Sequence, residues 1–458
     1  MLTVEKIGGT SMSALKDVID NIIYYNRTGN NLYNRVFIVS AFSGVTNLLL
    51  ENKKTKAPGV YHQFATGNDY RSALESVRLH LRQLNANYGP LGLNITHADE
   101  VTDNMINRVL MYLDSANTML ASGYLNEGIL LAVREILASI GESHSAFILA
   151  NILRNKGLNV ALADLSGLGD GRSFTIDERI KEEFANIDLK NCLCIATGYV
   201  KGTEGIMREF DRGYSEVTFS RIAELLRPEE AIIHKEYHLS TADPGLVGIE
   251  NVKPVGYTNY DIADQLADVG MEAIHPKAAK PLEIARINLR IKNTFEPEHP
   301  GTLITKNYIS EHKRVEVITG TDQQLLIDIY DPLMVGAVGS DLDIMQVFAR
   351  YDISYIFKAT SANSISIVIW ENDLKQQLLK DLREKYEQVT VEPVAMVCLL
   401  GSNMDQPGLL AKATAALANA EINILSAGVA LRKVNFQFLI ARQHFKDAII
   451  ALNKAVGQ

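Results

Sequence analysis

The chain has 458 residues, of which 47% are hydrophobic, and its formal net charge is −9 with a pI near 5.7. This length and apolar content predict a globular protein of about two to four domains, each with a hydrophobic core. The acidic balance argues against a nucleic-acid-binding surface and against a patch for anionic membranes, since both need clustered Lys and Arg. Any anion that the chain binds is therefore expected to be small.

The amino terminus and the cysteines predict a cytoplasmic protein. Residues 1–6 show no basic region followed by an apolar core, and no apolar run approaches the roughly 18 residues of a membrane-spanning helix. Cys192, Cys194 and Cys398 are too few for a disulfide framework, and Cys192 and Cys194, in a strand-like run, are expected to be buried thiols. His234 and His238 only faintly resemble a zinc helix, because the acid between them is misplaced, so no metal site is predicted.

The first chemically distinctive stretch is Lys6-Ile7-Gly8-Gly9-Thr10-Ser11, which follows a strand-like run beginning at Thr3. The glycines predict a turn with geometries that a Cβ would forbid, and Ser11 or Ser13 is expected to cap the helix that follows. Unpaired N–H groups at such a helix start can hold phosphate oxygens while Lys6 supplies a positive charge. The spacing of a Walker loop is missing, and a tight turn with a surface lysine would suit the same residues.

The next segments predict an α/β sheet. Residues 15–23 carry apolar side chains at helical spacing, and Val36 to Ser40 is a continuous apolar run typical of a parallel strand covered on both faces. Strand, helix and strand in this order predict a right-handed crossover. Small and hydroxylic residues at 40–47 follow at the carboxyl edge, where such sheets bind ligands. Residues from about 51 to 130 are interpreted as a helical insertion, either a lid or a dimer surface.

Further candidates lie between residues 130 and 226. A helix is predicted over 130–140, and Gly141-Glu142 is expected to open another, so Glu142 could simply be an acid favoured at a helix amino terminus. Strands are predicted over 160–165 and 192–197. The glycine-bearing loop after them reaches Arg212, whose guanidinium could clamp a carboxylate through paired hydrogen bonds.

Several short motifs in the correct order resemble those of the aspartate kinases, within the amino-acid kinase family. They are Lys6 to Ser11, Ser40 to Asn47, Gly141-Glu142, Arg212-Gly213-Tyr214-Ser215-Glu216, Thr241-Ala242-Asp243-Pro244, His275-Pro276 and residues 292–304. The resemblance implies an αβα sandwich with a mainly parallel central sheet over residues 1–305. The details at 210–216 and 234–236 resemble most the aspartate kinases encoded with ectoine biosynthesis.

The resemblance also implies an activity. ATP with Mg²⁺ would phosphorylate the side-chain carboxylate of L-aspartate to give 4-phospho-L-aspartate, and positioning and charge stabilisation would supply the rate. The expected catalytic residues are Lys6, Arg212 and Glu216. The expected aspartate-binding residues are Ser40, Thr46, Glu142, Arg212 and Ser215, with Arg212 on the α-carboxylate and Glu142 on the α-ammonium. The expected nucleotide-binding residues are Lys6, Gly8, Gly9, Lys235, Asp243 and Pro244.

The departures from the family pattern concentrate in the nucleotide-binding half. His234-Lys235 stands where Thr-Asp is usual, Gly245 replaces a common arginine, and Glu272 replaces a phosphate-facing lysine. Lys235 could restore some of the lost positive charge. Glu216 keeps the charge of the usual aspartate on a longer side chain. A catalytically weak amino-acid sensor is therefore an alternative function, and a kinase of glutamate or carbamate is another.

The carboxyl-terminal third predicts a second module. A linker at 306–314 precedes two βαββαβ units of the ACT type, over 315–390 and 391–458. The second unit lacks a fourth strand, which 315–318 is expected to supply, so the first unit would be inserted within the second. By the resemblance, such a pair binds an amino-acid effector such as lysine or threonine, although Thr360-Ser361-Ala362 lacks the family's acidic residue. A dimerisation module without a ligand fits as well. A homodimer or a dimer of dimers is expected.

Overall fold

The computed structural model describes residues 2–52, 55–123, 126–210, 213–271, 274–429 and 432–457, without the side chains of Asn126 and Glu209. Its residues form two compact units. The first unit comprises residues 1–238 and 274–305, and the second comprises residues 239–273 and 306–458. Residues 239–273 therefore group with the carboxyl-terminal segment, which no sequence pattern indicated. The domain boundaries at 305, 314 and 390 stay a prediction.

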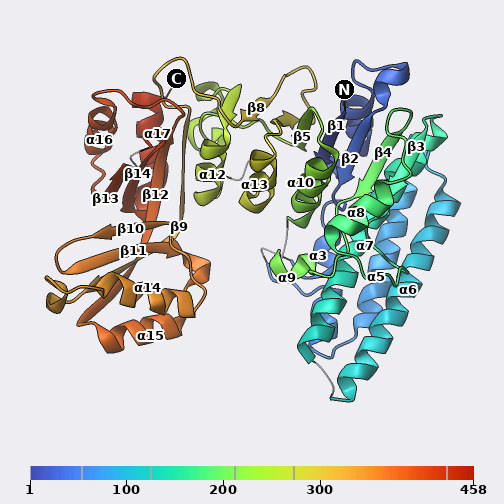
Figure 1. The fold of residues 1–458 in the computed structure, drawn as a ribbon, viewed down its shortest axis with the longest axis horizontal. Coiled ribbons are helices and arrows are strands. Elements are labelled where there is room, and N and C mark those ends of the chain that lie inside the picture. Colours follow the sequence, from blue (N-terminus) through green and yellow to red (C-terminus); the bar gives the residue numbers. More distant parts are fainter. Residues whose placement is uncertain are drawn as a thin grey trace. The chain divides into compact units, whose positions relative to one another are not determined.

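The first unit is built on a mainly parallel sheet (Figure 1). Its strands include, in spatial order, β3-β4-β2-β1-β5-β7-β8; the pairings from β3 to β7 are parallel, and β7 and β8 pair in antiparallel fashion. They are β1 (Thr3–Ile7), β2 (Arg35–Val39), β3 (Val160–Ala163), β4 (Leu193–Thr197), β5 (Glu230–Lys235), β7 (Leu289–Asn293) and β8 (Thr302–Thr305). The predicted α/β class is confirmed. The chain passes to opposite sides of β1 when it forms β2 and β5, and such a switch point is where α/β sheets bind ligands.

The segment after β1 is helical, but its start differs from the prediction. It comprises α1 (Gly9–Ser13), α2 (Leu15–Asp17) and a π-helix, η1 (Val18–Tyr24). The expected apolar face is buried, as Leu15, Ile19 and Ile23 show. Gly8 is the N-cap of α1, and no side chain caps it, so the capping role predicted for Ser11 or Ser13 is wrong.

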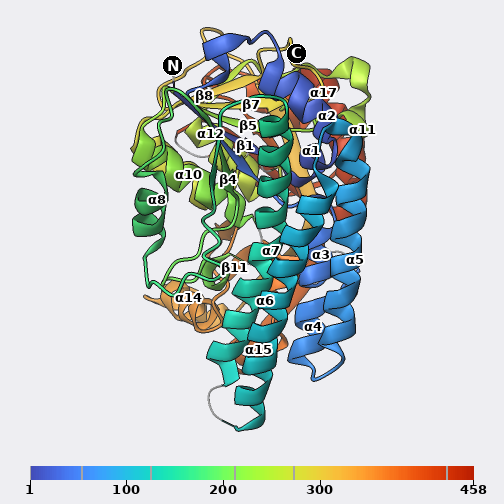
Figure 2. The same ribbon diagram turned by 90° about the vertical axis from the view of Figure 1, so that its right-hand side faces the viewer.

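Long helices dominate the segment that was predicted to be a helical insertion. These are α5 (Tyr70–Tyr88) and α6 (Ile95–Ala121), preceded by the short helices α3 (Val45–Leu49) and α4 (Val60–Ala65). They are followed by α7 (Asn126–Asn155), and α5, α6 and α7 run side by side (Figure 2). The predicted break at Gly141 is wrong, because α7 continues through it. A Cβ at Gly141 would lie 2.6 Å from the Cβ of Ala41, so the glycine serves close packing between α7 and the end of β2.

Helix α7 is a core helix of the first unit. By length and composition, residues 127–155 could cross a membrane, which the sequence pattern did not indicate. However, 83% of its most apolar window is buried inside the protein. Further helices of the unit include α8 (Ile176–Phe184), α9 (Ile206–Glu209), α10 (Tyr214–Leu226) and α13 (Pro276–Ile284). The three cysteines of the chain are buried free thiols, as predicted for Cys192 and Cys194.

The second unit contains an antiparallel sheet with strand order β10-β11-β9-β12-β14-β13. The strands are β9 (Val317–Tyr330), β10 (Phe357–Thr360), β11 (Ser364–Trp370), β12 (Gln388–Leu400), β13 (Ile424–Val429) and β14 (Asn435–Ala441). Strands β9 and β12 each run through both ACT-type halves. Val317 lies opposite Leu400 and Ile318 opposite Leu399, which is the pairing that a nested arrangement of the two halves requires.

Two hydrophobic cores lie under the helices of this unit. One forms below α14 (Ser340–Arg350) and α15 (Gln376–Lys385), and the other below α16 (Leu409–Asn419) and α17 (Phe445–Val456). A third cluster joins the sheet to residues 239–273, which include α11 (Pro244–Val247), η4 (Ile249–Asn251), β6 (Tyr257–Asn259) and α12 (Tyr260–Asp268). This cluster explains why that segment groups with the second unit.

Candidate active site

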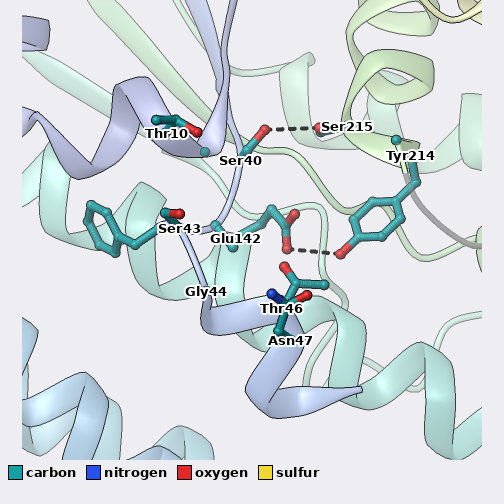
Figure 3. A pocket seen from close by; sticks show the side chains of 13 residues that line it. Thr10, Ser40, Ser43, Gly44, Thr46, Asn47, Glu142, Tyr214 and Ser215 are labelled. Atoms are coloured by element: carbon teal, nitrogen blue, oxygen red, sulfur yellow. Dashed lines mark hydrogen bonds between the residues drawn. The ribbon is translucent and has the colours of Figure 1, made fainter. Parts of the chain in front are cut away.

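A cavity of 290 Å³ lies where β1 and β2 end (Figure 3). It is lined by Gly9, Thr10, Ser40, Ala41, Phe42, Ser43, Gly44, Thr46, Asn47, Glu142, Gly213, Tyr214 and Ser215. Four of the residues predicted to bind aspartate, Ser40, Thr46, Glu142 and Ser215, are therefore brought together from three separate parts of the chain. The cavity lies at the carboxyl edge of the sheet, as the strand order favours.

Among the described residues that line this cavity, Glu142 alone has an ionisable carboxyl group. The residue is 3% exposed, and its carboxyl group points between Tyr214 and Thr46 (Figure 3). Tyr214 donates its hydroxyl to Oε2 of Glu142 at 3.4 Å. Burial raises the pKa of Glu142 to about 7, although Tyr214 and the charge of Lys6 oppose this effect. Because Glu142 lies in the interior of α7, its interpretation as a charge at a helix amino terminus is wrong.

Two serine hydroxyls meet across the cavity. Ser40 Oγ and Ser215 Oγ lie 3.0 Å apart and connect the end of β2 with the first turn of α10. Ser145 of α7 donates its hydroxyl to the carbonyl of Ser40 at 2.9 Å, which fixes this part of the wall. Gly198 makes the convergence possible, because a Cβ there would lie 2.8 Å from Ser215 Cβ and 2.6 Å from the carbonyl oxygen of Val39.

Lys6 and Glu216 form a largely buried ion pair near the end of β1. Lys6 Nζ lies 3.3 Å from Glu216 Oε1, and Glu216 Oε2 accepts the backbone N–H of His275 at 2.7 Å. Burial alone would raise the pKa of Glu216, but the charges of Lys6 and Lys235 and the His275 N–H lower it below its ordinary value. Lys6 and Glu216, which were both predicted to be catalytic, are therefore in direct contact in the structure.

The glycine turn after Lys6 differs from its prediction. Gly8 has φ −69°, which any residue adopts, and its N–H donates to the carbonyl of His234 at 3.4 Å. Gly9 is required sterically, since a Cβ there would lie 2.7 Å from the carbonyl oxygen of Ala41. The backbone N–H and hydroxyl of Ser11 both donate to Glu236 Oε1, at 3.1 and 3.3 Å. The N–H groups of Gly8 and Ser11 are therefore already paired, contrary to the expectation of unpaired donors.

Comparison with known proteins decides the family of the chain. Residues 1–293, which are more than half of the chain, match the amino acid kinase family. The chain belongs to the amino acid kinase family.

The relatives of this amino acid kinase are aspartate kinases. It is 44% identical over 464 residues to aspartate kinase Ask_Ect of Stutzerimonas stutzeri (strain A1501), with 100% of this chain and 97% of that protein covered. It is 26% identical to the chloroplastic aspartokinase 1 of Arabidopsis thaliana, over 99% of this chain and 79% of that protein. The crystal structure of E. coli aspartokinase III with aspartate and ADP has a TM-score of 0.75 at 19% identity, with both chains fully covered, which shows the shared fold. The resemblance to aspartate kinases is thereby confirmed.

Other predicted site residues of this kinase lie elsewhere. Arg212 and Glu272 lie outside the described residues. Asp243 and Pro244 belong to the second unit, where Asp243 Oδ1 accepts the N–H of Gly245 at 2.7 Å and caps α11. Lys235 ends β5, and its charge acts on Glu216. The nucleotide-binding roles of these residues stay a prediction.

The described residues of the kinase contain no group of three or more His, Cys, Asp or Glu side chains that could hold a metal ion. His234 and His238, the weak zinc candidates, contact separate carboxylates instead. His234 Nε2 lies 2.8 Å from Glu5, and His238 Nε2 lies 3.0 Å from Glu296. That no zinc site forms at this histidine pair stays a prediction.

Two tyrosines of the kinase site were missed from the sequence. Tyr214 lines the cavity and contacts Glu142, and its ring lies edge-on to Tyr199 at 5.9 Å. Tyr199 in turn donates its hydroxyl to Glu135 at 2.5 Å. A signal for Tyr214 was present, because it replaces the second glycine of the family's Arg-Gly-Gly-Ser-Asp motif and such a large side chain must occupy space near the substrate.

Proposed function

We propose that this chain catalyses phosphoryl transfer from ATP to the side-chain carboxylate of L-aspartate, giving 4-phospho-L-aspartate and ADP. It is an aspartate kinase. The observation that carries the proposal is the cavity in which Glu142, Ser40 and Ser215 converge at the edge of the sheet, close to the end of the strand that bears Lys6. Of the related enzymes, E. coli aspartokinase III has been crystallised with aspartate and ADP, the substrate and product of this reaction.

The residues of the cavity suit an amino-acid substrate. Glu142 offers a buried carboxylate to the α-ammonium group of the substrate. Pairing with a cation is favourable for this carboxylate because burial has removed much of its hydration. Ser40, Ser215 and Thr46 offer hydroxyls to the carboxylates of aspartate. Arg212 is assigned to the α-carboxylate by its place in the family motif. Binding both ends of the substrate fixes the side-chain carboxylate for attack, which supplies much of the rate in phosphoryl transfer.

Lys6 is the residue that stabilises the transferred phosphoryl group. Its ammonium group is held near the sheet edge by Glu216, which is itself fixed by the His275 N–H. A pre-positioned cation of this kind acts where negative charge grows in the transition state. Gly9 permits the close backbone packing on which this position depends. We assign Gly8, Lys235, Asp243 and Pro244 to the nucleotide by the family motifs.

Magnesium fits this scheme only as a companion of ATP. The described residues contain no cluster of ligating side chains that could form a dedicated metal cage. Mg²⁺ commonly keeps several waters and binds through substrate phosphates with few protein ligands. The ion would neutralise charge on the phosphates, whereas the residues named above bind and orient the two substrates.

A coupled ADP-release assay with aspartate and with glutamate tests the proposal. We expect ADP release that requires aspartate and that glutamate does not support. A weak amino-acid sensor is the second candidate, favoured by the substitutions at Lys235, Gly245 and Glu272. Calorimetric titration with ATP distinguishes the two, since a kinase must bind ATP. Absence of both ATP binding and aspartate-dependent ADP release would overturn the kinase proposal.

We further propose that the ACT-type halves bind an amino-acid effector. E. coli aspartokinase III has been crystallised with lysine and aspartate, so effector binding occurs in a protein of this fold. Repeating the ADP-release assay with lysine and with threonine tests the proposal. We also propose a cytoplasmic homodimer or dimer of dimers, and light scattering of the purified protein would measure the oligomeric state.

A further inference from the structure

One face of the central sheet carries charged residues at positions that are usually apolar. Parallel strands covered on both faces are ordinarily apolar throughout. In this sheet Glu5 lies opposite Ile232, Ile232 opposite Arg290, and His234 opposite Lys292. Alternate residues of a strand share a face, so Glu5, His234, Arg290 and Lys292 share one face, while Lys6 faces the other.

These side chains line a second cavity of 360 Å³ within the first unit. Its charged lining residues are Glu5, Arg27, Arg35, Glu230, Arg290 and Lys292. The two cavities share no lining residue. We call this second cavity the basic cleft. It is separate from the aspartate cavity and has no role in the reaction derived above.

Both carboxylates of the basic cleft already have arginine partners. Arg35 Nε and Nη2 donate to the two oxygens of Glu5 at 2.7 and 3.1 Å. Arg290 Nε and Nη2 donate to Glu230 at 2.8 to 3.0 Å. His234 also contacts Glu5, and burial lowers the pKa of this histidine, which keeps it neutral near pH 7. Paired hydrogen bonds of this kind are strong, so these four charges balance one another.

With Arg35 and Arg290 paired to the two carboxylates, Arg27 and Lys292 leave the lining of the basic cleft with two positive charges in excess. Arg27 Nη1 lies 3.9 Å from Glu5, whose oxygens already accept from Arg35. Lys292 Nζ donates to a carbonyl, that of Pro297, at 3.2 Å. Burial lowers the pKa of both groups, and neighbouring arginines add to the effect, while the charge of Glu5 opposes it. An anion in the basic cleft would relieve this repulsion.

We propose that the basic cleft binds a small oxygen-bearing dianion, such as inorganic phosphate or a short dicarboxylate, between Arg27 and Lys292. Two partly buried cations in excess over the paired charges match a dianion in both charge and hydrogen-bond donors. The chain as a whole is acidic, with a formal net charge of −9, so a general attraction to anions would not account for binding at this place.

Thermal unfolding with increasing inorganic phosphate tests the proposal, with malonate as the dicarboxylate arm. A ligand that binds only the folded protein raises its melting temperature as its concentration passes Kd. We expect the rise in the parent protein and its loss in Arg27→Gln and in Lys292→Gln. Lys16→Gln is the matched control, because Lys16 is an exposed lysine paired with Asp20 on the surface, and it should keep the full rise.

Two crossed measurements separate the basic cleft from the nucleotide site. Lys6→Gln should keep the phosphate-dependent rise, and Lys292→Gln should keep the stabilisation by ADP. Without phosphate, Lys292→Gln should melt at or above the temperature of the parent protein, since it removes a charge whose burial is unfavourable. If the charges of the basic cleft served only to stabilise the fold, Lys292→Gln should instead melt below the temperature of the parent protein. The proposal is overturned if neither phosphate nor malonate stabilises the parent, or if the double variant of Arg27 and Lys292 responds as the parent does. Calorimetric titration of phosphate into the ADP-saturated parent supplies the second readout if that variant does not fold.

Discussion

Replacing Glu142 with Gln should change stability and activity in opposite directions. Burial raises the pKa of Glu142 from 4.5 to about 7 in the free protein. When folding raises the pKa of an acid, the free energy of unfolding falls as the pH rises from the unfolded-state pKa to the folded-state pKa. Below the unfolded-state pKa the acid is neutral in both states and this loss is absent. At about pH 8 the ionised carboxylate therefore costs about 3 kcal/mol of folding free energy, compared with a neutral group.

The stability of Glu142→Gln should consequently depend on pH. The variant keeps the shape of the side chain and can still accept from Tyr214. At about pH 8 its free energy of unfolding should exceed that of the parent by up to about 3 kcal/mol, and the gain should shrink toward about pH 5. Thermal unfolding at the two pH values measures this difference, which corresponds to several degrees in a chain of this size.

Activity should fall in the same variant. Loss of a charged partner for the α-ammonium group removes about 1.5–3 kcal/mol, or roughly 10- to 150-fold in kcat/KM for aspartate. In the parent, kcat/KM for aspartate should rise with pH through about 7, since Glu142 must be ionised while facing Lys6 and Tyr214. The pH profile of the variant should lack this rise, which is the acid limb of the profile. Reduced stability at about pH 8 together with unchanged aspartate kinetics would refute the reasoning.

Three further substitutions test other parts of the site. Lys6→Ala should lower kcat roughly 100- to 1,000-fold with an unchanged circular dichroism spectrum, because it removes a pre-positioned charge; near-normal turnover would contradict its role. Gly9→Ala should lower the free energy of unfolding by about 1–3 kcal/mol through overpacking against Ala41, measured by urea unfolding, and an unchanged midpoint would count against this steric requirement. Tyr214→Phe should lower kcat/KM for aspartate about 2- to 10-fold and move the acid limb of its pH profile upward, because it removes a donor to Glu142. Tyr199→Phe, whose hydroxyl contacts Glu135, should not shift that limb, and equal shifts would refute the assignment.

The parts of the fold that the sequence predicts well are those set by local pattern. Strands β1 and β2 and the apolar face of residues 15–23 follow from periodicity, and each is buried as expected. Ser40 could be placed at a ligand site because it follows β2 at the carboxyl edge of the sheet, whereas Ser215, in the first turn of α10, was assigned only by the resemblance to the family motif. Residues 317–318 could be placed beside β12 because the second ACT-type half lacks a strand.

The features that the sequence analysis missed share a physical cause. Each depends on contacts between segments that are far apart in the sequence. Gly141 looks like a helix break in the sequence, but it lies inside α7, where the absence of a side chain lets the helix pack closely against Ala41. The grouping of residues 239–273 with the second unit follows from a shared apolar cluster. The carboxylate of Glu5 gave no local signal, since its partners Arg35 and His234 lie on other strands.

Trapping of the product with hydroxylamine tests the central claim most directly. An acyl phosphate reacts with hydroxylamine to give a hydroxamate, whereas simple hydrolysis of ATP gives none. With ATP, Mg²⁺ and L-aspartate, the parent protein should form aspartyl hydroxamate in step with ADP, and Lys6→Ala should form almost none. Release of ADP without hydroxamate, or equal hydroxamate from both proteins, would contradict phosphoryl transfer to the aspartate carboxylate at the site beside Lys6.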